Sequence, residues 1–213
     1  MTTATSGRFR DWYRERLLPV VIDKACASAG FAEPRAATVA GTHGTVLEIG
    51  FGSGLNLRHY PAAVERLLAV EPAARAVELA QPRIERVAFP VEVIGLDGQR
   101  LPVDDASVDC VVSTFTLCTI PDVAAALREV HRVLKPGGTF HVLEHGLADD
   151  HDVRRWQHRM DPIQQRVAGG CHLDRDIPDL LQAAGFRWGE LHRWYAGRPK
   201  TLTALTRTVA SAA

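Results

Sequence analysis

The stretch Thr45–Gly54, TVLEIGFGSG, constrains the fold of this chain more than any other segment. Its first half is a short apolar run, and such a run bounded by glycines is typical of a strand buried on both faces of a parallel sheet. Its second half holds three alternating glycines, Gly50, Gly52 and Gly54. Because glycine allows close approaches that a Cβ would forbid, a ligand can lie against bare main chain at the start of the next helix. The stretch predicts a strand, a ligand-binding loop and a helix from Leu55 to about Tyr60.

The spacing of the loop indicates which ligand it binds. A dinucleotide fingerprint requires G-x-G-x-x-G, and Leu55 stands where the last glycine should be. Glu48 precedes the first glycine by two residues, and a carboxylate there would repel a pyrophosphate and attract an ammonium. S-adenosylmethionine fits this pattern because it carries a zwitterionic amino acid and a sulfonium but no phosphate. A glycine-rich turn without a ligand is the structural alternative.

Length and composition limit the other possibilities. The chain has 213 residues and 46% hydrophobic content, which suit one domain with one core. Lysine and arginine together number 25, as do the acids, so no basic field favours nucleic acid. No apolar run approaches the roughly 20 residues of a membrane span, and we expect a cytoplasmic protein with no membrane span. The four cysteines form no C-x-x-C pair, so we expect reduced thiols and no metal site. The oligomeric state stays open.

Strands alternate with helices along the rest of the chain. Further strands are predicted at Leu67–Val70, Val91–Gly95, Asp109–Thr114 and Thr139–Leu143. Helices are predicted at Arg8–Ala29, Ala73–Ala88, Pro121–Leu134, Asp149–Val167 and Arg175–Ala184. We expect a linker at residues 31–44, a turn at Lys135-Pro136-Gly137-Gly138, Asp174 as a helix cap, and a final hairpin of Trp188–Tyr195 and Thr201–Val209 around a GRPK turn. This alternation predicts an α/β fold with a doubly wound, Rossmann-like, mostly parallel sheet and helices on both faces.

Two acids follow strands at positions where nucleotide folds hold their ligand. Glu71 lies 17 residues beyond Gly54, where a carboxylate can accept from both ribose hydroxyls, although it could also be a solvated acid. Asp97 follows the Val91–Gly95 strand and could accept from the adenine amine while the backbone of Gly98 or Gln99 reads the ring. An Asx turn is the alternative role of Asp97.

Four motifs carry a family resemblance: LEIGFGSG, LAVEP, GLDGQRLPVDDASVDCVV and LREVHRVLKPGGTF. Together they resemble the class I S-adenosylmethionine-dependent methyltransferases over about residues 45–145. The resemblance implies a seven-stranded sheet in the order 3-2-1-4-5-7-6 with strand 7 antiparallel, and S-adenosylhomocysteine as product. It assigns Glu48 and the glycines to the methionine, Glu71 to the ribose, and Asp97 with Gly98 to the adenine. The full predicted cofactor set is Glu48, Gly50, Gly52, Gly54, Asn56, Glu71, Pro72, Asp97, Gly98, Ser113, Thr114 and Leu117.

The second half of the chain favours a thiol acceptor. TFTLCTIPD, LEHG, RRWQHRMDP and GGCHLDRD are similar to a branch that includes animal thiol S-methyltransferases and many bacterial relatives. The animal proteins begin with an apolar membrane segment, whereas this chain begins with a polar amphipathic one. Small-molecule O- or N-methylation and a non-catalytic S-adenosylmethionine-binding module are the alternatives. A nicotinamide dehydrogenase and a nucleic-acid methyltransferase fit the loop and the charge less well.

Methyl transfer is an in-line displacement, so the protein mainly aligns donor and acceptor and excludes water. His145 is the predicted base that deprotonates the acceptor, or else a strand-end histidine satisfied by backbone. The predicted acceptor-side residues are Trp12, Tyr13, His145, Trp156, Met160, Cys171 and His172. Core packing is the alternative for several of them. The expected organisation is residues 1–44 as helical cap and linker, 45–145 as cofactor-binding core, and 146–213 as acceptor-covering helices and hairpin.

Overall fold

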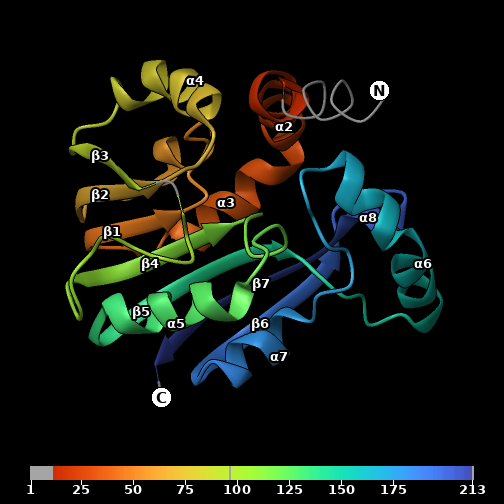
Figure 1. Cartoon of the computed structure of the whole chain (residues 1–213). Helices are drawn as coiled ribbons and strands as arrows, with labels where there is room; N and C mark the ends of the chain where they lie inside the picture. Colours follow the sequence, from red (N-terminus) through yellow and green to blue (C-terminus); the bar gives the residue numbers. More distant parts are fainter. Residues whose placement is uncertain (1–11, 96, 213) are drawn as a thin grey trace, which may run out of the picture.

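A seven-stranded sheet forms the centre of the computed structural model, which describes residues 12–95 and 97–212 (Figure 1). The strands are β1 Gly44–Ile49, β2 Val64–Val70, β3 Val91–Gly95, β4 Val108–Thr114, β5 Leu134–His145, β6 Phe186–Tyr195 and β7 Ala204–Ala212. Their order is β3-β2-β1-β4-β5-β7-β6. The first five strands pair in parallel, and β7 runs antiparallel to both β5 and β6. The predicted fold class, strand order and antiparallel strand are confirmed.

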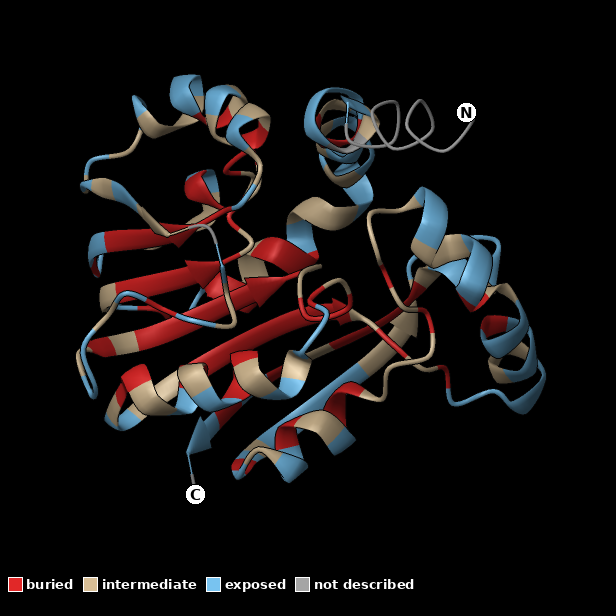
Figure 2. Cartoon of the chain, viewed as in Figure 1, coloured by how far each residue is buried: buried red, intermediate tan, exposed pale blue. Residues whose placement is uncertain are grey.

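Helices cover both faces of the sheet. They are η1 Tyr13–Leu17, α2 Leu18–Cys26, η2 Ala29–Phe31, α3 Ala32–Val39, η3 Leu57–His59, α4 Ala74–Ile84, α5 Val123–Val133, α6 His151–Val167, α7 Ile177–Ala183 and α8 Lys200–Thr203. On one face, α5 and α7 pack against Leu47, Ile49 and their neighbours in the larger core. On the other face, α3, η3 and α4 contribute Val39, Leu57 and Ala80 to a second core. Figure 2 shows the resulting burial of the central strands.

The predicted linker at residues 31–44 is wrong, because Ala32–Val39 is helix α3. Pro34 and the glycines on either side of this segment are typical of loops. Pro34, however, lies in the first turn of α3, where its missing N–H costs nothing, and Gly41 and Gly44 follow the helix. The helix packs against β5 and β7 and carries Arg35 toward the carboxyl end of the sheet.

Four further boundaries differ from prediction. The glycine loop leads into a single 3₁₀ turn, η3, and not into the helix predicted from Leu55 to Tyr60. The predicted Lys135–Gly138 turn lies within β5, with Gly137 at a φ of +81°. Asp176, not Asp174, caps α7 by accepting from the Asp179 N–H. The connection between β6 and β7 includes α8, so β7 begins at Ala204 and not at Thr201.

The carboxyl ends of β1, β2, β4 and β5 meet at one edge because these strands are parallel, and ligands of open α/β sheets bind at this edge. Residues 1–11, where the predicted first helix begins, lie outside the described part of the chain. Within that part, no helix has the length and apolar character that crossing a bilayer would require.

Candidate cofactor site

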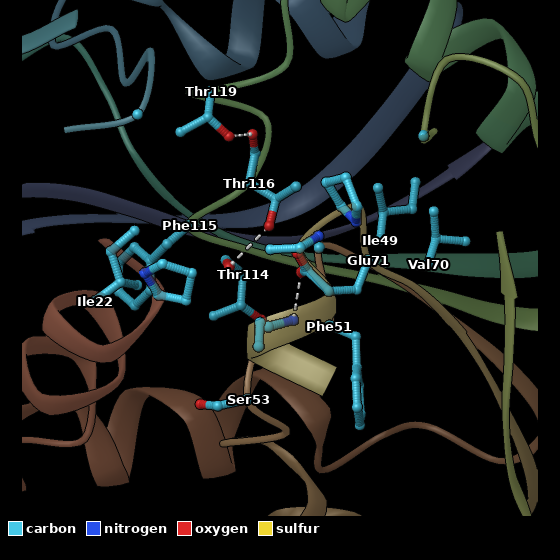
Figure 3. A pocket seen from close by; sticks show the side chains of 18 of the residues that line it. Ile22, Ile49, Phe51, Ser53, Val70, Glu71, Thr114, Phe115, Thr116 and Thr119 are labelled. Atoms are coloured by element: carbon cyan, nitrogen blue, oxygen red, sulfur yellow. Dashed lines mark hydrogen bonds between the residues drawn. The ribbon is translucent and has the colours of Figure 1, made fainter. Parts of the chain in front are cut away.

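A cavity of about 610 Å³ opens at the carboxyl ends of β1, β2 and β4, and its size is typical of small-molecule sites (Figure 3). Eight predicted cofactor residues line it: Glu48, Gly50, Gly52, Glu71, Pro72, Asp97, Gly98 and Thr114. In the view of Figure 3, Ile22 and Phe115 lie on the opposite side from Ile49 and Val70. The cavity therefore joins the sheet edge to a wall made by α2 and the loop after β4.

The glycine loop needs its glycines for two different reasons. Gly50, Gly52 and Gly54 have φ values of +67°, +58° and +75°, where side chains with a Cβ are strained. A Cβ on Gly50 would also lie 2.0 Å from Thr116 Oγ1. A Cβ on Gly54 would meet Leu57 Cδ1 at 2.8 Å, behind the loop, and Gly54 does not line the cavity.

Glu71, at the carboxyl end of β2, holds the loop in place. One carboxylate oxygen accepts from the Gly52 N–H at 2.7 Å, and the other accepts from the Ala73 N–H at 2.8 Å. The side chain is buried, and burial raises its pKa. Each oxygen keeps a second lone pair for a ligand hydroxyl at the cavity surface.

Glu48 lies at the centre of a buried polar network. Its two carboxylate oxygens accept from Asn56 Nδ2 at 2.8 Å and from the Tyr60 hydroxyl at 2.7 Å. Burial raises the pKa of Glu48 to about 7, partly offset by the Tyr60 and Asn56 hydrogen bonds. Asn56 also donates to Thr114 Oγ1, so this predicted cofactor residue orients the cavity wall while lying beneath it.

Arg35 is a cavity residue that the sequence did not indicate, because it lies in the helix predicted as a linker. Its side chain is buried, and Nη1 donates to Asn56 Oδ1 at 2.8 Å. The guanidinium lies 5.2 Å from the centre of the Phe115 ring. Arg35 Nε is buried and has no hydrogen-bond partner in the described part of the chain. Buried donors without a partner are rare in folded proteins, and this one belongs to a residue that lines the cavity.

Asp97 and Gly98 follow β3 and line the cavity. One Asp97 oxygen accepts from both the backbone N–H and the side-chain amide of Gln99. These bonds are an Asx-type turn and lower the pKa of Asp97. A Cβ on Gly98 would lie 2.8 Å from Ile49 Cγ2, so the backbone there approaches the sheet closely. Both of the roles considered for Asp97 are compatible with this geometry.

Glu144, near the carboxyl end of β5, holds the loop after β4 in place. This fully buried carboxylate accepts from the Ser113 hydroxyl and from the N–H groups of Thr116, Leu117 and Cys118. Within the segment Ser113–Leu117, which the family resemblance assigns to the cofactor, Thr114, Phe115 and Thr116 line the cavity. Ser113 and Leu117 are buried supports beneath it, and Thr119 is a lining residue outside the predicted segment.

The predicted acceptor-side residues lie away from the cavity wall. Trp12 and Trp156 have exposed fractions of 51% and 57%. Tyr13 donates to the Val167 carbonyl, which joins η1 to α6, and Met160 is half-buried on α6. Side chains from α2 take the place expected for these residues, among them Leu18, Ile22 and Cys26. Periodicity identified the N-terminal helix but not the residues that face the ligand.

His145, Cys171 and His172 lie behind the wall. The Cys171 and Cys118 sulfurs are 3.5 Å apart, and the His145 ring lies 5.0 Å from that of Phe115. The hydrogen bond with Cys118, and then His145, lower the pKa of Cys171 to about 5. His172 contacts Asp161 and Gln165 of α6.

Known proteins resemble this chain in both sequence and fold. Residues 47–142 match the methyltransferase domain family. The thiol S-methyltransferase TMT1A of Homo sapiens is 33% identical over 146 residues, which cover 67% of this chain and 59% of that protein. The UbiE C-methyltransferase of ubiquinone and menaquinone biosynthesis from Rubrivivax gelatinosus is 37% identical over 109 residues, 51% of this chain and 41% of that protein. The chain thus spans little more than half of the first relative's length.

Two similar solved structures share the fold across 96% of this chain. A chain of the complex between the Haloferax volcanii Trm112 methyltransferase activator and a methyltransferase has a TM-score of 0.72 at 20% identity, covering 96% of this chain and 97% of that one. This chain belongs to the class I S-adenosylmethionine-dependent methyltransferases. A phosphoethanolamine N-methyltransferase of Haemonchus contortus with bound S-adenosylhomocysteine has a TM-score of 0.70 at 15% identity, covering 96% and 60%. S-adenosylmethionine is the cofactor of this class.

We predict that S-adenosylmethionine binds more tightly as pH rises from 5.5 to 7.5. The prediction assumes that the carboxylate form of Glu48 would attract the ligand ammonium, and the pKa of Glu48 is about 7 in the free protein. The ligand amine stays largely protonated over this range, since α-amino groups titrate at about 7.7–8.0. Calorimetry across this range should show an affinity that rises and then levels off, and Glu48→Gln should remove the slope. A wild-type affinity that does not vary with pH would mean that Glu48 does not bind the ligand ammonium.

Proposed function

We propose that this chain transfers the methyl group of S-adenosylmethionine to the sulfur of a small apolar thiol. The observation that carries the proposal is the cavity, in which a buried acid and a buried arginine stand beside the glycine loop and an apolar wall faces them. The similarity to thiol S-methyltransferases over two thirds of the chain supports sulfur as the acceptor atom.

The cofactor would lie along the sheet edge with its amino acid end against β1. Arg35 Nε supplies a donor for the carboxylate, and Glu48 supplies negative charge for the ammonium. Glu71 would accept from the ribose hydroxyls, and Asp97 with the close backbone at Gly98 would hold the adenine. A positive Arg35 and a negative Glu48 would face the two charged groups of one ligand amino acid. This pair of charges suits a zwitterion and not a phosphate.

The acceptor would enter from the side of α2. Leu18, Ile22 and Phe115 give this wall an apolar character that suits an aromatic or aliphatic thiol. Such a wall excludes water from the reacting atoms, and the protein then accelerates the displacement mainly by alignment. The thiol must react as a thiolate, because the thiolate is the nucleophile.

An acceptor panel tests this function. Purified protein with S-adenosylmethionine should form S-adenosylhomocysteine and a methyl thioether with thiophenol or an alkanethiol, and little product with phenol or aniline of similar shape. Gly50→Ala protein, which should bind the cofactor about 100-fold more weakly, serves as the low-activity control. Turnover of phenol or aniline above that of the thiols would replace sulfur with another acceptor atom. Cofactor binding without turnover of any acceptor would favour a binding module.

A further inference from the structure

The fold brings together three metal-ligating side chains behind the cavity wall. Cys118 lies in the loop after β4, His145 ends β5, and Cys171 lies in the loop after α6. The two sulfurs are 3.5 Å apart. A ring nitrogen of His145 and both sulfurs all lie within 4.8 Å of one another. The chain has no C-x-x-C pair, so only folding reveals this group.

The geometry and chemistry of the three groups match a tetrahedral metal centre. Two thiolates at about 2.3 Å from Zn²⁺ lie roughly 3.8 Å from each other, close to the separation seen here. Two thiolates and an imidazole are the soft and borderline ligands that thiophilic divalent cations prefer. In the described part of the chain the group supplies three donors, the number typical of catalytic zinc sites with one open position.

We propose that Cys118, His145 and Cys171 bind a thiophilic divalent cation such as Zn²⁺, whose open position takes the sulfur of the acceptor. The acceptor role rests on the proposed thiol methylation. The cation site itself rests only on the three side chains.

The group lies next to the cavity, behind the side chains that line it. The loop that supplies Cys118 also supplies Phe115, Thr116 and Thr119 to the cavity wall. The loop that supplies Cys171 also supplies Ala168 and Gly169. Cys118 precedes the lining residue Thr119 by one position, and Cys171 follows the lining residue Gly169 by two. The cation would therefore lie behind these two loops, next to the Phe115 ring that His145 contacts.

Buried hydrogen bonds hold the two loops together without a metal. The His172 N–H donates to the Cys118 carbonyl at 2.8 Å, and Glu144 accepts from the Cys118 N–H. Arg175 donates to the carbonyls of Leu117 and Ile120. Supports of this kind orient ligands in advance and are a feature of built metal sites.

The cation would supply thiolate at neutral pH. The acceptor thiol loses its proton to solvent as its sulfur binds the cation. A lone pair of that sulfur then attacks the methyl carbon, the new S–CH₃ bond forms, and the sulfonium–CH₃ bond breaks. The electron pair of the broken bond stays on the sulfur of S-adenosylhomocysteine, and no oxidant or reductant takes part.

Cobalt(II) titration tests the cation site without any activity measurement. Protein kept reduced with a phosphine and cleared of metal by chelation should bind one Co²⁺. Its visible spectrum should be that of a tetrahedral site with sulfur ligands. Cys118→Ala and His145→Gln should each weaken Co²⁺ binding by more than about 100-fold, because removing a ligand costs more than the 10–100-fold typical of supporting residues. Cys110→Ala, at a buried thiol within β4, is the matched control and should bind as wild type.

Each other outcome overturns the site. Absence of Co²⁺ binding by the folded, reduced protein would do so. Co²⁺ binding that persists in both variants would also overturn the site, because the ion would then lie elsewhere, for example at Asp161, His172 and Asp174. A Cys118–Cys171 disulfide that forms readily in air while metal does not bind would make the pair a redox device. Circular dichroism and S-adenosylmethionine binding show whether each variant is folded.

Adding thiophenol separates the site from the proposed function. If thiophenol occupies the open position, the Co²⁺ spectrum should change even without S-adenosylmethionine. Metal binding with no thiol turnover leaves the site standing and removes the proposed function. Thiol turnover that is equally fast in metal-free protein removes the catalytic role of the cation and leaves thiol methylation in place.

Discussion

Gly50→Ala should weaken S-adenosylmethionine binding by about 100-fold or more. Alanine at a φ of +67° costs about 1–2 kcal/mol in strain. Its Cβ would lie 2.0 Å from Thr116 Oγ1 and 2.7 Å from Thr116 Cβ, so the loop after β4 must move. That loop lines the cavity, and displacements of about 1 Å at a binding site can cost about 100-fold. Calorimetric titration of the variant measures the effect.

Gly137→Ala separates the collision from the strain. Gly137 has a φ of +81°, but an added Cβ there meets nothing within 4 Å. The variant should lose only the stability that backbone strain costs, about 1–2 kcal/mol in thermal melts, and keep wild-type affinity for S-adenosylmethionine. Equal affinity loss in the two variants would mean that backbone strain, and not the Thr116 contact, governs the site.

Glu71→Gln should weaken S-adenosylmethionine binding by about 10–100-fold. The substitution replaces one acceptor oxygen by an NH₂ group and removes the charge, while Gly52 and Ala73 both need acceptors there. Hydrogen bonds to charged groups contribute about 1.5–3 kcal/mol, which corresponds to this range. The loss should fall on S-adenosylhomocysteine equally, because both ligands carry the ribose.

Glu78→Gln is the matched control for Glu71. It lies on α4 in an exposed pair with Arg75, and exposed pairs contribute little. Its affinity for S-adenosylmethionine should equal that of the wild type. If Glu71→Gln binds normally while folded, neither a contact of Glu71 with the ribose nor its clamp on the glycine loop would govern cofactor affinity.

The sheet could be predicted from sequence because its strands are short apolar runs separated by turn residues. The edge at which ligands bind follows from parallel pairing, so the sequence alone predicts that Glu48, Glu71 and Asp97 lie together, as they do in the cavity wall. Helix α3 could not be predicted in this way. A proline such as Pro34 breaks a helix at an interior position but is tolerated in the first turn, and the sequence pattern does not tell the two positions apart. Because Arg35 lies in this helix, it was not predicted as a site residue either.

The acceptor side was harder to predict because long-range packing determines it. Helical periodicity marked the N-terminal segment, but it could not tell that Ile22 faces the cavity while Trp12 lies away from it. Cys118 and Cys171 are separated by 53 positions in the sequence, and only the contact between two loops reveals the pair. Local patterns carry no information of this kind.

Isothermal titration of the purified protein with S-adenosylmethionine, S-adenosylhomocysteine and NAD tests the central claim most directly. The cavity, with its two buried carboxylates and its buried arginine, predicts saturable one-site binding of the first two ligands and none of NAD. Failure of both S-adenosyl compounds to bind folded protein, or preferential binding of NAD, would contradict the account.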